Sequence, residues 1–259
     1  MQIAILGAGA FGQALAKILR DNHHASTFYD PLLFPEISLD QACRRAEAVI
    51  IAIPTEAITS FLAIYPPKLK QLPTILASKG LFSLELFKEF PNFSIVSGPA
   101  FADEILAGHG ATMTASSQFC AKLLHNQQID IELSDDALGI TICGALKNIY
   151  AIGAGYHAEA PDELAKYIQS AHQETKDYLT RHGAQAATAE LSCGLGDLIL
   201  TCTNRTSRNF RAGQLLRKGR SKRTILRKLQ TVEGISAATR ADRKGYPLIS
   251  EIYQLVNQK

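Results

Sequence analysis

Lys147 and Asn148 are the two adjacent residues whose types and surroundings point most directly to chemistry. They close the stretch Cys143–Asn148, in which the other residues are small or apolar. A lysine in such a run loses hydration unless it faces a cleft or an anion. A lysine in a cleft can transfer a proton, and the neighbouring amide can orient a carbonyl or hydroxyl group. Because most lysines are simply hydrated at the surface, the pair gains meaning only from the rest of the chain.

A glycine-rich segment near the start of the chain has the spacing of a dinucleotide-binding turn. It follows Gln2–Leu6, which we expect to be a buried strand, and it opens a helical stretch. Gly7 permits a tight turn, Gly9 lets the backbone approach a pyrophosphate, and Gly12 lets helix and strand pack closely. Because the motif lies between a strand and a helix, it predicts dinucleotide binding. The predicted contacts are Gly7, Gly9, Ala10, Phe11 and Gly12.

Asp30 is an acidic residue at the end of the next expected strand, Ala25–Tyr29. A carboxylate about 20 residues beyond the glycines can accept hydrogen bonds from a ribose 2′-hydroxyl, and its charge repels a 2′-phosphate. This position favours NAD(H), with NADP(H) as the alternative. Asp30 could instead only start the turn before Pro31.

Further strands are expected at Ala48–Ile53, Thr74–Ala77, Phe93–Ser97 and Ala111–Ala115. Their alternation with helical stretches predicts an α/β, Rossmann-like domain with a doubly wound parallel sheet. Between Asp30 and Ala48 there is room for one short helix only, which we place at Leu39–Ala46.

Ligands of doubly wound sheets bind beyond the carboxyl ends of the strands. The residues expected there are Pro54, Lys79, Gly98, Ala100 and Ala102. Lys79, which precedes Gly80, would place a cation beside an anionic substrate. A solvated loop lysine is the alternative interpretation.

The second half of the chain is expected to be helical. Small and apolar residues occur on nearly every turn of Leu138–Gly155, which predicts a helix packed on several sides. A second helix, polar on one side, is expected at Asp162–Thr180. We therefore expect a dinucleotide-binding domain at residues 1–136 and an all-α domain at residues 137–259 that carries catalytic and substrate-binding groups.

A basic segment runs from Arg205 to Lys228 and holds ten Lys or Arg residues and no acid. For Arg217–Lys228 the simplest interpretation is a solvated helix face. A nucleic-acid surface would call for interleaved aromatic residues or a binding motif, and the segment has neither. Ser207, Arg208 and Asn209 together offer a hydroxyl, a guanidinium and an amide, which match the oxygens of a phosphate group.

The composition limits the class of protein. With 259 residues, 46% hydrophobic and 20% charged, and a net charge of +3, the chain is typical of a globular protein with one or two domains. Five widely spaced cysteines without a CxxC pair indicate reduced thiols. The chain enters a strand directly, without a signal peptide, and no apolar run is long enough to span a bilayer. We expect a cytoplasmic protein without a metal, a membrane span or a nucleic-acid partner.

Seven motifs, in order along the chain, resemble the NAD(P)-dependent glycerol-3-phosphate dehydrogenases of the bacterial type. They are GAGAFGQALA from Gly7, ASKGL around Lys79, SGPAFADEI from Ser97, GALKN around Lys147, GLGDLILTC around Asp197, SRNFRAG from Ser207, and VEG at Val232 to Gly234. The resemblance implies reversible reduction of dihydroxyacetone phosphate by NAD(P)H to sn-glycerol 3-phosphate, a precursor of glycerophospholipids.

The resemblance also implies a role for each matching residue. Lys147 looks like the general acid/base, and Asp197 like the carboxylate that holds it, with Thr201 and Asn148 as further catalytic positions. Lys79 is similar to a lysine that touches both substrate and cofactor. The implied substrate contacts are Lys79, Gly98, Ala100, Lys147, Asp197, Ser207, Arg208 and Asn209. The later implied cofactor contacts are Pro54, Ala102, Arg208, Thr231 and Glu233.

The chain also departs from the family pattern. It is shorter after the second strand and at its C-terminal end, and Pro161 stands where relatives usually have a glycine-rich turn. Ala100 replaces a residue that is often threonine, so a hydroxyl is missing from the expected pocket. These departures leave open the alternative of a shortened, weakly active or inactive dinucleotide-binding relative with a regulatory role. A homodimer paired through the helical domain is expected by analogy with two-domain reductases.

Overall fold

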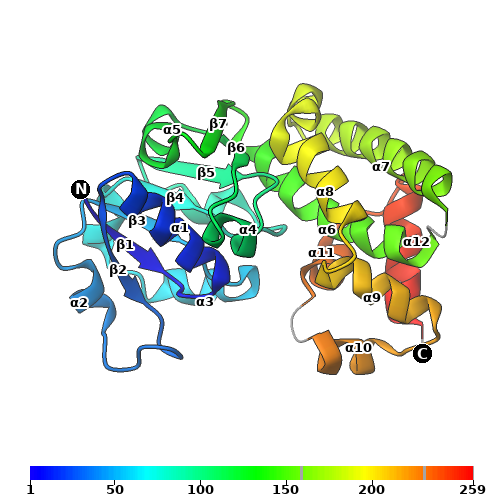
Figure 1. Cartoon of the computed structure of the whole chain (residues 1–259), viewed down its shortest axis with the longest axis horizontal. Coiled ribbons are helices and arrows are strands. Elements are labelled where there is room, and N and C mark those ends of the chain that lie inside the picture. The colour runs from blue at the N-terminus through cyan, green and yellow to red at the C-terminus, as the bar shows by residue number, and fades with distance from the viewer. Residues whose placement is uncertain (158–159, 230–231, 259) are drawn as a thin grey trace. The chain divides into compact units, whose positions relative to one another are not determined.

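The computed structural model of the chain (Figure 1) describes residues 1–157, 160–229 and 232–258. Its internal contacts divide the chain into two compact units, Met1–Ala137 and Leu138–Lys259. The first unit combines a sheet with helices, and the second is built from helices. The predicted fold class, a Rossmann-like α/β domain followed by an all-α domain, is confirmed.

One seven-stranded sheet forms the first unit, in the order β2-β1-β3-β4-β5-β6-β7. The strands are β1 (Gln2–Leu6), β2 (Ala25–Tyr29), β3 (Ala48–Ile51), β4 (Thr74–Leu76), β5 (Phe93–Ser97), β6 (Ala111–Ala115) and β7 (Ile129–Leu133). The strands β1 to β5 pair in parallel, and β1 lies between β2 and β3. The chain therefore changes its direction of winding at β1 and β3. In a doubly wound sheet such a change opens a crevice at the carboxyl ends of the strands.

One strand pairing departs from the predicted parallel sheet. The strand β6 pairs antiparallel with β5, and β7 runs parallel to β6. A buried apolar strand has the same residue pattern in either direction, so the sequence could not show this reversal. The strand β7 was not predicted, although Ile129–Leu133 alternates apolar and acidic residues as an edge strand does.

Helices of the first unit connect the strands and bury apolar side chains against the sheet. They are α1 (Ala10–Asp21), α2 (Leu39–Cys43), α3 (Ile58–Ala63), α4 (Ala102–Leu106) and α5 (Gln118–Leu124). The helix α1 buries Ala14, Leu15, Ile18 and Leu19 in the same core as Ile3 and other strand residues. Their spacing of three and four residues places them on one face of the helix. The helix expected at Leu39–Ala46 ends earlier, at Cys43.

The second unit is arranged around one long buried helix. Its helices are α6 (Ala137–His157), α7 (Pro161–Arg181), α8 (Asp197–Thr203), α9 (Arg208–Arg217), α10 (Lys222–Leu229), α11 (Glu233–Arg240) and α12 (Pro247–Asn257), with a π-helical turn at Ser192–Gly196. Every residue of α6 from Gly139 to Gly155 is buried. By length and composition α6 could cross a membrane, but 89% of its most apolar stretch is buried inside the protein. It has the character of a core helix.

Glu174 of α7 accepts hydrogen bonds from the first backbone N–H groups of α12. This helix begins at Pro247 without a side-chain cap of its own. Its Oε2 accepts the Leu248 N–H at 2.9 Å and its Oε1 accepts the Ile249 N–H at 3.0 Å. The Tyr150 hydroxyl of α6 also donates to Oε1, at 3.3 Å. One buried carboxylate therefore joins three helices and occupies two backbone donors that would otherwise lack a partner.

Burial raises the pKa of Glu174, and its three hydrogen bonds offset this only in part. A carboxyl whose pKa is higher in the folded than in the unfolded protein is easier to protonate when folded. The stability that Glu174 contributes is therefore largest below the ordinary carboxyl pKa, and it falls as the pH rises through the raised pKa.

We expect Glu174→Ala to lower the free energy of unfolding by about 1–3 kcal/mol, because the two N–H groups of α12 lose their acceptor. Glu174→Gln keeps an acceptor and should lose less. Urea denaturation followed by circular dichroism, repeated across the acidic pH range, measures both effects. The exposed Glu190→Ala is the control. This role would be contradicted if Glu174→Ala and Glu190→Ala lowered the free energy of unfolding equally. It would also be contradicted if the difference in this free energy between the parent protein and Glu174→Gln did not change with pH.

Candidate active site

The glycine turn after β1 leaves room for a ligand at one position and none at its two flanking positions. Gly7 has a φ of +106°, and a Cβ there would lie 2.5 Å from the Ala52 carbonyl oxygen. A Cβ on Gly12 would collide with the Gly7 carbonyl oxygen, whereas a Cβ on Gly9 would meet nothing within 4 Å. Gly9 is the N-cap residue of α1 and has no side chain to occupy the first N–H groups of the helix. The turn therefore presents open backbone donors and a helix N-terminus, which suit a phosphate group.

Both carboxylate oxygens of Asp30 accept hydrogen bonds from backbone N–H groups. Its Oδ2 accepts the Ala8 N–H of the glycine turn at 2.9 Å. Its Oδ1 accepts the N–H groups of Leu32 at 3.0 Å and Leu33 at 3.2 Å. Asp30 therefore does start a turn, and it also joins the end of β2 to the glycine segment. A carboxylate oxygen has two acceptor positions. Both positions of Oδ1 are used by Leu32 and Leu33, whereas Oδ2 accepts one N–H and keeps a second position for a ribose hydroxyl.

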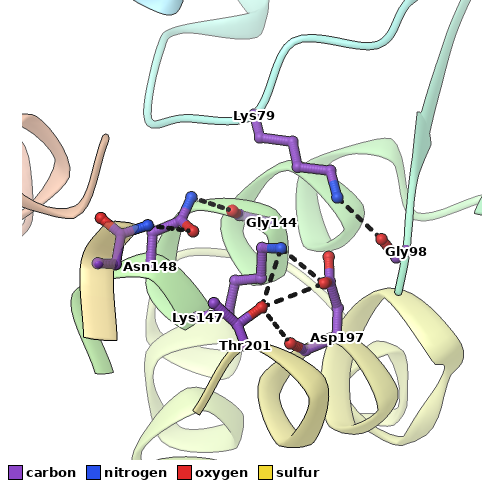
Figure 2. A network of polar contacts seen from close by, with 8 residues as sticks. Lys79, Gly98, Gly144, Lys147, Asn148, Asp197 and Thr201 are labelled. Carbon is purple, nitrogen blue, oxygen red and sulfur yellow. Dashed lines mark hydrogen bonds and ion pairs between the residues drawn. The ribbon is translucent and has the colours of Figure 1, made fainter. Parts of the chain in front are cut away.

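Lys79 lies beyond the carboxyl end of β4, where it contacts segments that follow β1 and β5. Its Nζ donates to the Gly98 carbonyl at 2.8 Å (Figure 2) and lies 5.6 Å from the centre of the Phe11 ring. Its own carbonyl accepts the Thr55 hydroxyl at 3.0 Å. The structure thus brings together four segments of the first unit that the sequence placed at strand ends: Phe11, Thr55, Lys79 and Gly98.

Lys147, Asp197 and Thr201 form a buried cluster within the second unit (Figure 2). The Lys147 Nζ donates to Asp197 Oδ1 at 2.6 Å and to the Thr201 hydroxyl at 3.2 Å. That hydroxyl donates to the Asp197 backbone carbonyl at 2.6 Å, which leaves its lone pairs toward the ammonium group. The side chains of Lys147 and Asp197 are 6% and 1% exposed. The three residues expected to work together therefore do meet, from α6 and α8.

The position of Asp197 explains how a carboxylate is accommodated in this interior. It is the first residue of α8, which continues the π-helical turn without a break, and its Oδ1 accepts from Lys147 at 2.6 Å and from Thr201 at 3.4 Å. The charges of Lys147 and Asp197 both affect the pKa of the buried Cys202 thiol. Burial raises the pKa of Cys202, Lys147 lowers it in part and Asp197 raises it further. Cys202 therefore stays a neutral thiol beside the ion pair.

The expected phosphate-binding segment begins α9, with Ser207 as its N-cap residue. The Arg208 Nη2 donates to Glu233 Oε1, at the start of α11, at 2.6 Å. The two side chains are 49% and 31% exposed, so the remaining guanidinium donors of Arg208 can reach an anion. Asn209 is buried and hydrogen-bonded to Asn148. That pairing was not predicted, because 61 residues separate the two asparagines and no local pattern connects them.

The remaining expected residues lie where their elements place them. Pro54 follows β3, Ala100 is buried beyond β5, and Ala102 is the first residue of α4. Thr231 falls outside the described residues. Across residues 1–157, 160–229 and 232–258, no group of three or more His, Cys, Asp or Glu side chains is arranged to hold a metal ion. The five cysteines are buried and none is in a disulfide.

Comparison with known proteins gives two family matches. Residues 29–122 match the N-terminal model of NAD-dependent glycerol-3-phosphate dehydrogenase, and residues 136–259 match the C-terminal model. A glycerol-3-phosphate dehydrogenase [NAD(P)+] of Oceanobacillus iheyensis is 30% identical over 307 positions, which cover 98% of this chain and 89% of the relative. The alignment is longer than the 259 residues of this chain, so the relative has segments without a counterpart here.

A second relative and a solved structure were also compared with this chain. A protein of the same name from Listeria monocytogenes is 33% identical and covers 92% of this chain and 84% of its own length. Among solved structures, a glycerol-3-phosphate dehydrogenase of Coxiella burnetii superposes with a TM-score of 0.84 at 23% identity, over 99% of this chain and 94% of that one. At that identity, the structural likeness shows the shared fold.

We expect Asp197→Leu to lower the free energy of unfolding by about 3–5 kcal/mol, because it leaves the Lys147 ammonium group buried without its carboxylate. The double variant Lys147→Met/Asp197→Leu removes both charges and should recover most of that loss. Denaturant unfolding of the two variants beside the parent protein provides the comparison. If the double variant is as unstable as the single one, the loss comes from packing and the buried charge is not its cause.

Proposed function

Because this chain belongs to the NAD-dependent glycerol-3-phosphate dehydrogenase family, we propose that it reversibly reduces dihydroxyacetone phosphate to sn-glycerol 3-phosphate with Lys147 as the proton donor. It is an oxidoreductase that depends on NAD(P)(H). The observation that carries the role of Lys147 is its buried cluster with Asp197 and Thr201. The product is a precursor of glycerophospholipids.

The cluster suits general acid/base catalysis at a carbonyl group. A bound nicotinamide supplies the hydride in reduction and takes it back in oxidation. The Lys147 ammonium group donates a proton to the substrate carbonyl oxygen as that oxygen gains negative charge, and it takes the proton back in the reverse direction. Asp197 accepts a hydrogen bond from the Lys147 ammonium group at 2.6 Å, and Thr201 restricts the direction in which Nζ points. One proton and one hydride are added, so a ketone becomes a secondary alcohol.

We assign dinucleotide binding to residues 1–136 and catalysis and substrate binding to residues 137–259. The open space at Gly9, between two crowded glycines, fits the approach of a pyrophosphate to the N-terminus of α1. From the family resemblance, the further positions proposed to contact the dinucleotide are Ala10, Phe11, Asp30, Pro54, Lys79, Ala102, Arg208 and Glu233, with Thr231 outside the described residues.

The substrate phosphate is proposed to bind at Ser207, Arg208 and Asn209. Arg208 provides the charge, and a phosphate would share its guanidinium with Glu233 or displace it. In the first unit, Lys79 with Gly98 and the buried Ala100 are proposed to bind the substrate carbon chain. Lys79 would add a second cation for an anionic substrate.

Asp30 supports a preference for NAD(H) over NADP(H). Its fixed carboxylate at the end of β2 would accept from a 2′-hydroxyl and repel a 2′-phosphate. We extend the proposal to a cytoplasmic homodimer. The five buried cysteines, none of which is in a disulfide, fit a reducing compartment.

Replacing Lys147 with Met should lower kcat for dihydroxyacetone phosphate reduction by about 10²–10⁴-fold, because the general acid is lost. The oxidation of NADH, followed by its absorbance, measures the rate. Lys176→Met is the matched control, since Lys176 pairs with Glu190 at 2.9 Å on the surface of the same unit. NADH binding by fluorescence should persist in Lys147→Met. Turnover that survives the substitution would refute the role of Lys147. Tight NADH binding by the parent protein without turnover would support an inactive regulatory relative.

With both nucleotides in the same assay, we expect KM for NADH to be lower than KM for NADPH by about tenfold or more, which corresponds to about 1.4 kcal/mol of discrimination. Asp30→Asn removes the charge and should narrow the difference. The exposed Asp130→Asn on β7 serves as the control. A clear preference of the parent protein for NADPH would overturn the assignment of Asp30.

A further inference from the structure

Asn148 is next to the proposed proton donor, yet its side chain is engaged within the protein. It is buried, its Nδ2 donates to the Gly144 carbonyl at 3.3 Å (Figure 2), and its Oδ1 accepts from Asn209 Nδ2 at 2.9 Å. The Asn209 Oδ1 in turn accepts the Gly234 N–H at 2.9 Å. A single chain of hydrogen bonds thus runs from α6 through α9 to the start of α11.

The Gly144 carbonyl and the Gly234 N–H, at the two ends of this series of hydrogen bonds, fix the orientation of both amide groups. The Gly144 carbonyl can only accept, so the NH₂ group of Asn148 must face it and the Asn148 oxygen must face Asn209. The Gly234 N–H can only donate, so the oxygen of Asn209 must face Gly234 and its NH₂ group must face Asn148. Turning over either amide would oppose like groups at both of its contacts. One N–H of Asn209 is used by Asn148, and its second N–H is held in a fixed direction.

Close packing leaves these hydrogen-bonded groups little freedom to rearrange. A Cβ on Gly234 would collide with the Asn148 backbone carbonyl and would lie 2.9 Å from Asn209 Oδ1. Asn209 is itself buried, at the second position of α9. The start of α11 therefore lies directly on the amide pair, and larger side chains at residue 234 would separate the three helices.

We propose that Asn148 is a positioning residue for the phosphate site, which acts by orienting the Asn209 amide so that its second N–H points to a phosphate oxygen. This inference rests on the proposed function in one respect, the binding of substrate phosphate at Ser207, Arg208 and Asn209. It assigns to Asn148 an effect on phosphate affinity in place of a direct effect on the reacting carbonyl group.

A pair of variants of equal shape isolates the hydrogen bond. Thr at residue 148 can donate to the Gly144 carbonyl, as Thr175 does to Ala171 at 2.8 Å and Thr180 does to Lys176 at 3.0 Å. Its oxygen is one bond nearer the backbone than the Asn148 amide oxygen, so it approaches Asn209 less closely. Val has the same branching without the hydroxyl. Comparing Asn148→Thr with Asn148→Val therefore tests polarity at nearly constant volume. Thr180→Val, an exposed position on α7, is the control for loss of a helix hydroxyl.

Binding of inorganic phosphate to the full-length protein, measured by titration calorimetry, and the kinetics with dihydroxyacetone phosphate are the readouts. We expect Asn148→Val to raise the phosphate Kd and the substrate KM about tenfold, the effect of one lost charge-assisted hydrogen bond, with kcat changed by less than about threefold. Asn148→Thr should recover part of this loss. A fall in kcat with unchanged phosphate Kd, or an Asn148→Val variant that binds phosphate as tightly as the parent protein, would overturn the inference.

Two further measurements separate this inference from the proposed function. If Arg208→Gln leaves the phosphate Kd unchanged, the phosphate site itself is wrongly placed. Thermal unfolding of Asn148→Val, Asn209→Leu and the double variant, without phosphate, tests the orienting contact alone. If the stability losses of the two single variants add up to that of the double variant, the two side chains are not coupled. That result would overturn the link between Asn148 and Asn209, wherever phosphate binds.

Discussion

The buried ion pair between Lys147 and Asp197 is the interaction on which the second unit depends. Moving two charges out of water is costly, and their attraction compensates only when geometry and hydrogen bonds are good. Here the pair is 2.6 Å apart, and Thr201 adds a further acceptor for the ammonium group. The long apolar helix α6 makes this arrangement necessary, because it holds its lysine in the interior with only 6% of the side chain exposed.

Polar contacts that extend from the surroundings of this pair hold the other helices. Glu174 joins α6, α7 and α12, and the Asn148–Asn209 pair joins α6, α9 and α11. Each is buried, and each uses backbone groups at a helix start or within a helix. A buried polar contact of this kind is satisfied in only one arrangement, so it fixes helix positions more strictly than apolar packing does. Helix placement and site geometry in this unit therefore have the same origin.

Much of the first unit could be predicted because its signals are local. The strand, glycine turn and helix from Gln2 to Arg20 form one uninterrupted pattern, and each buried strand is a short apolar run between turns. Local sequence patterns did not predict strand direction or contacts between residues far apart in the sequence. The antiparallel pairing of β6 with β5 has no signature in either strand, and the double attachment of Asp30 to Ala8 and to the following turn joins segments 22 residues apart.

By itself, the sequence determined the α/β order of the first half, the helical second half and the glycine turn between β1 and α1. These follow from residue type and short-range spacing, which local steric and solvation rules interpret directly. The candidate roles of Asp197 and Thr201 came from the resemblance of short motifs to a known family. The tertiary structure alone decided which of those residues meet: Lys147 with Asp197, Arg208 with Glu233, and Asn148 with Asn209. Such pairs are 25 to 61 residues apart, and they form only after the helices that carry them have packed.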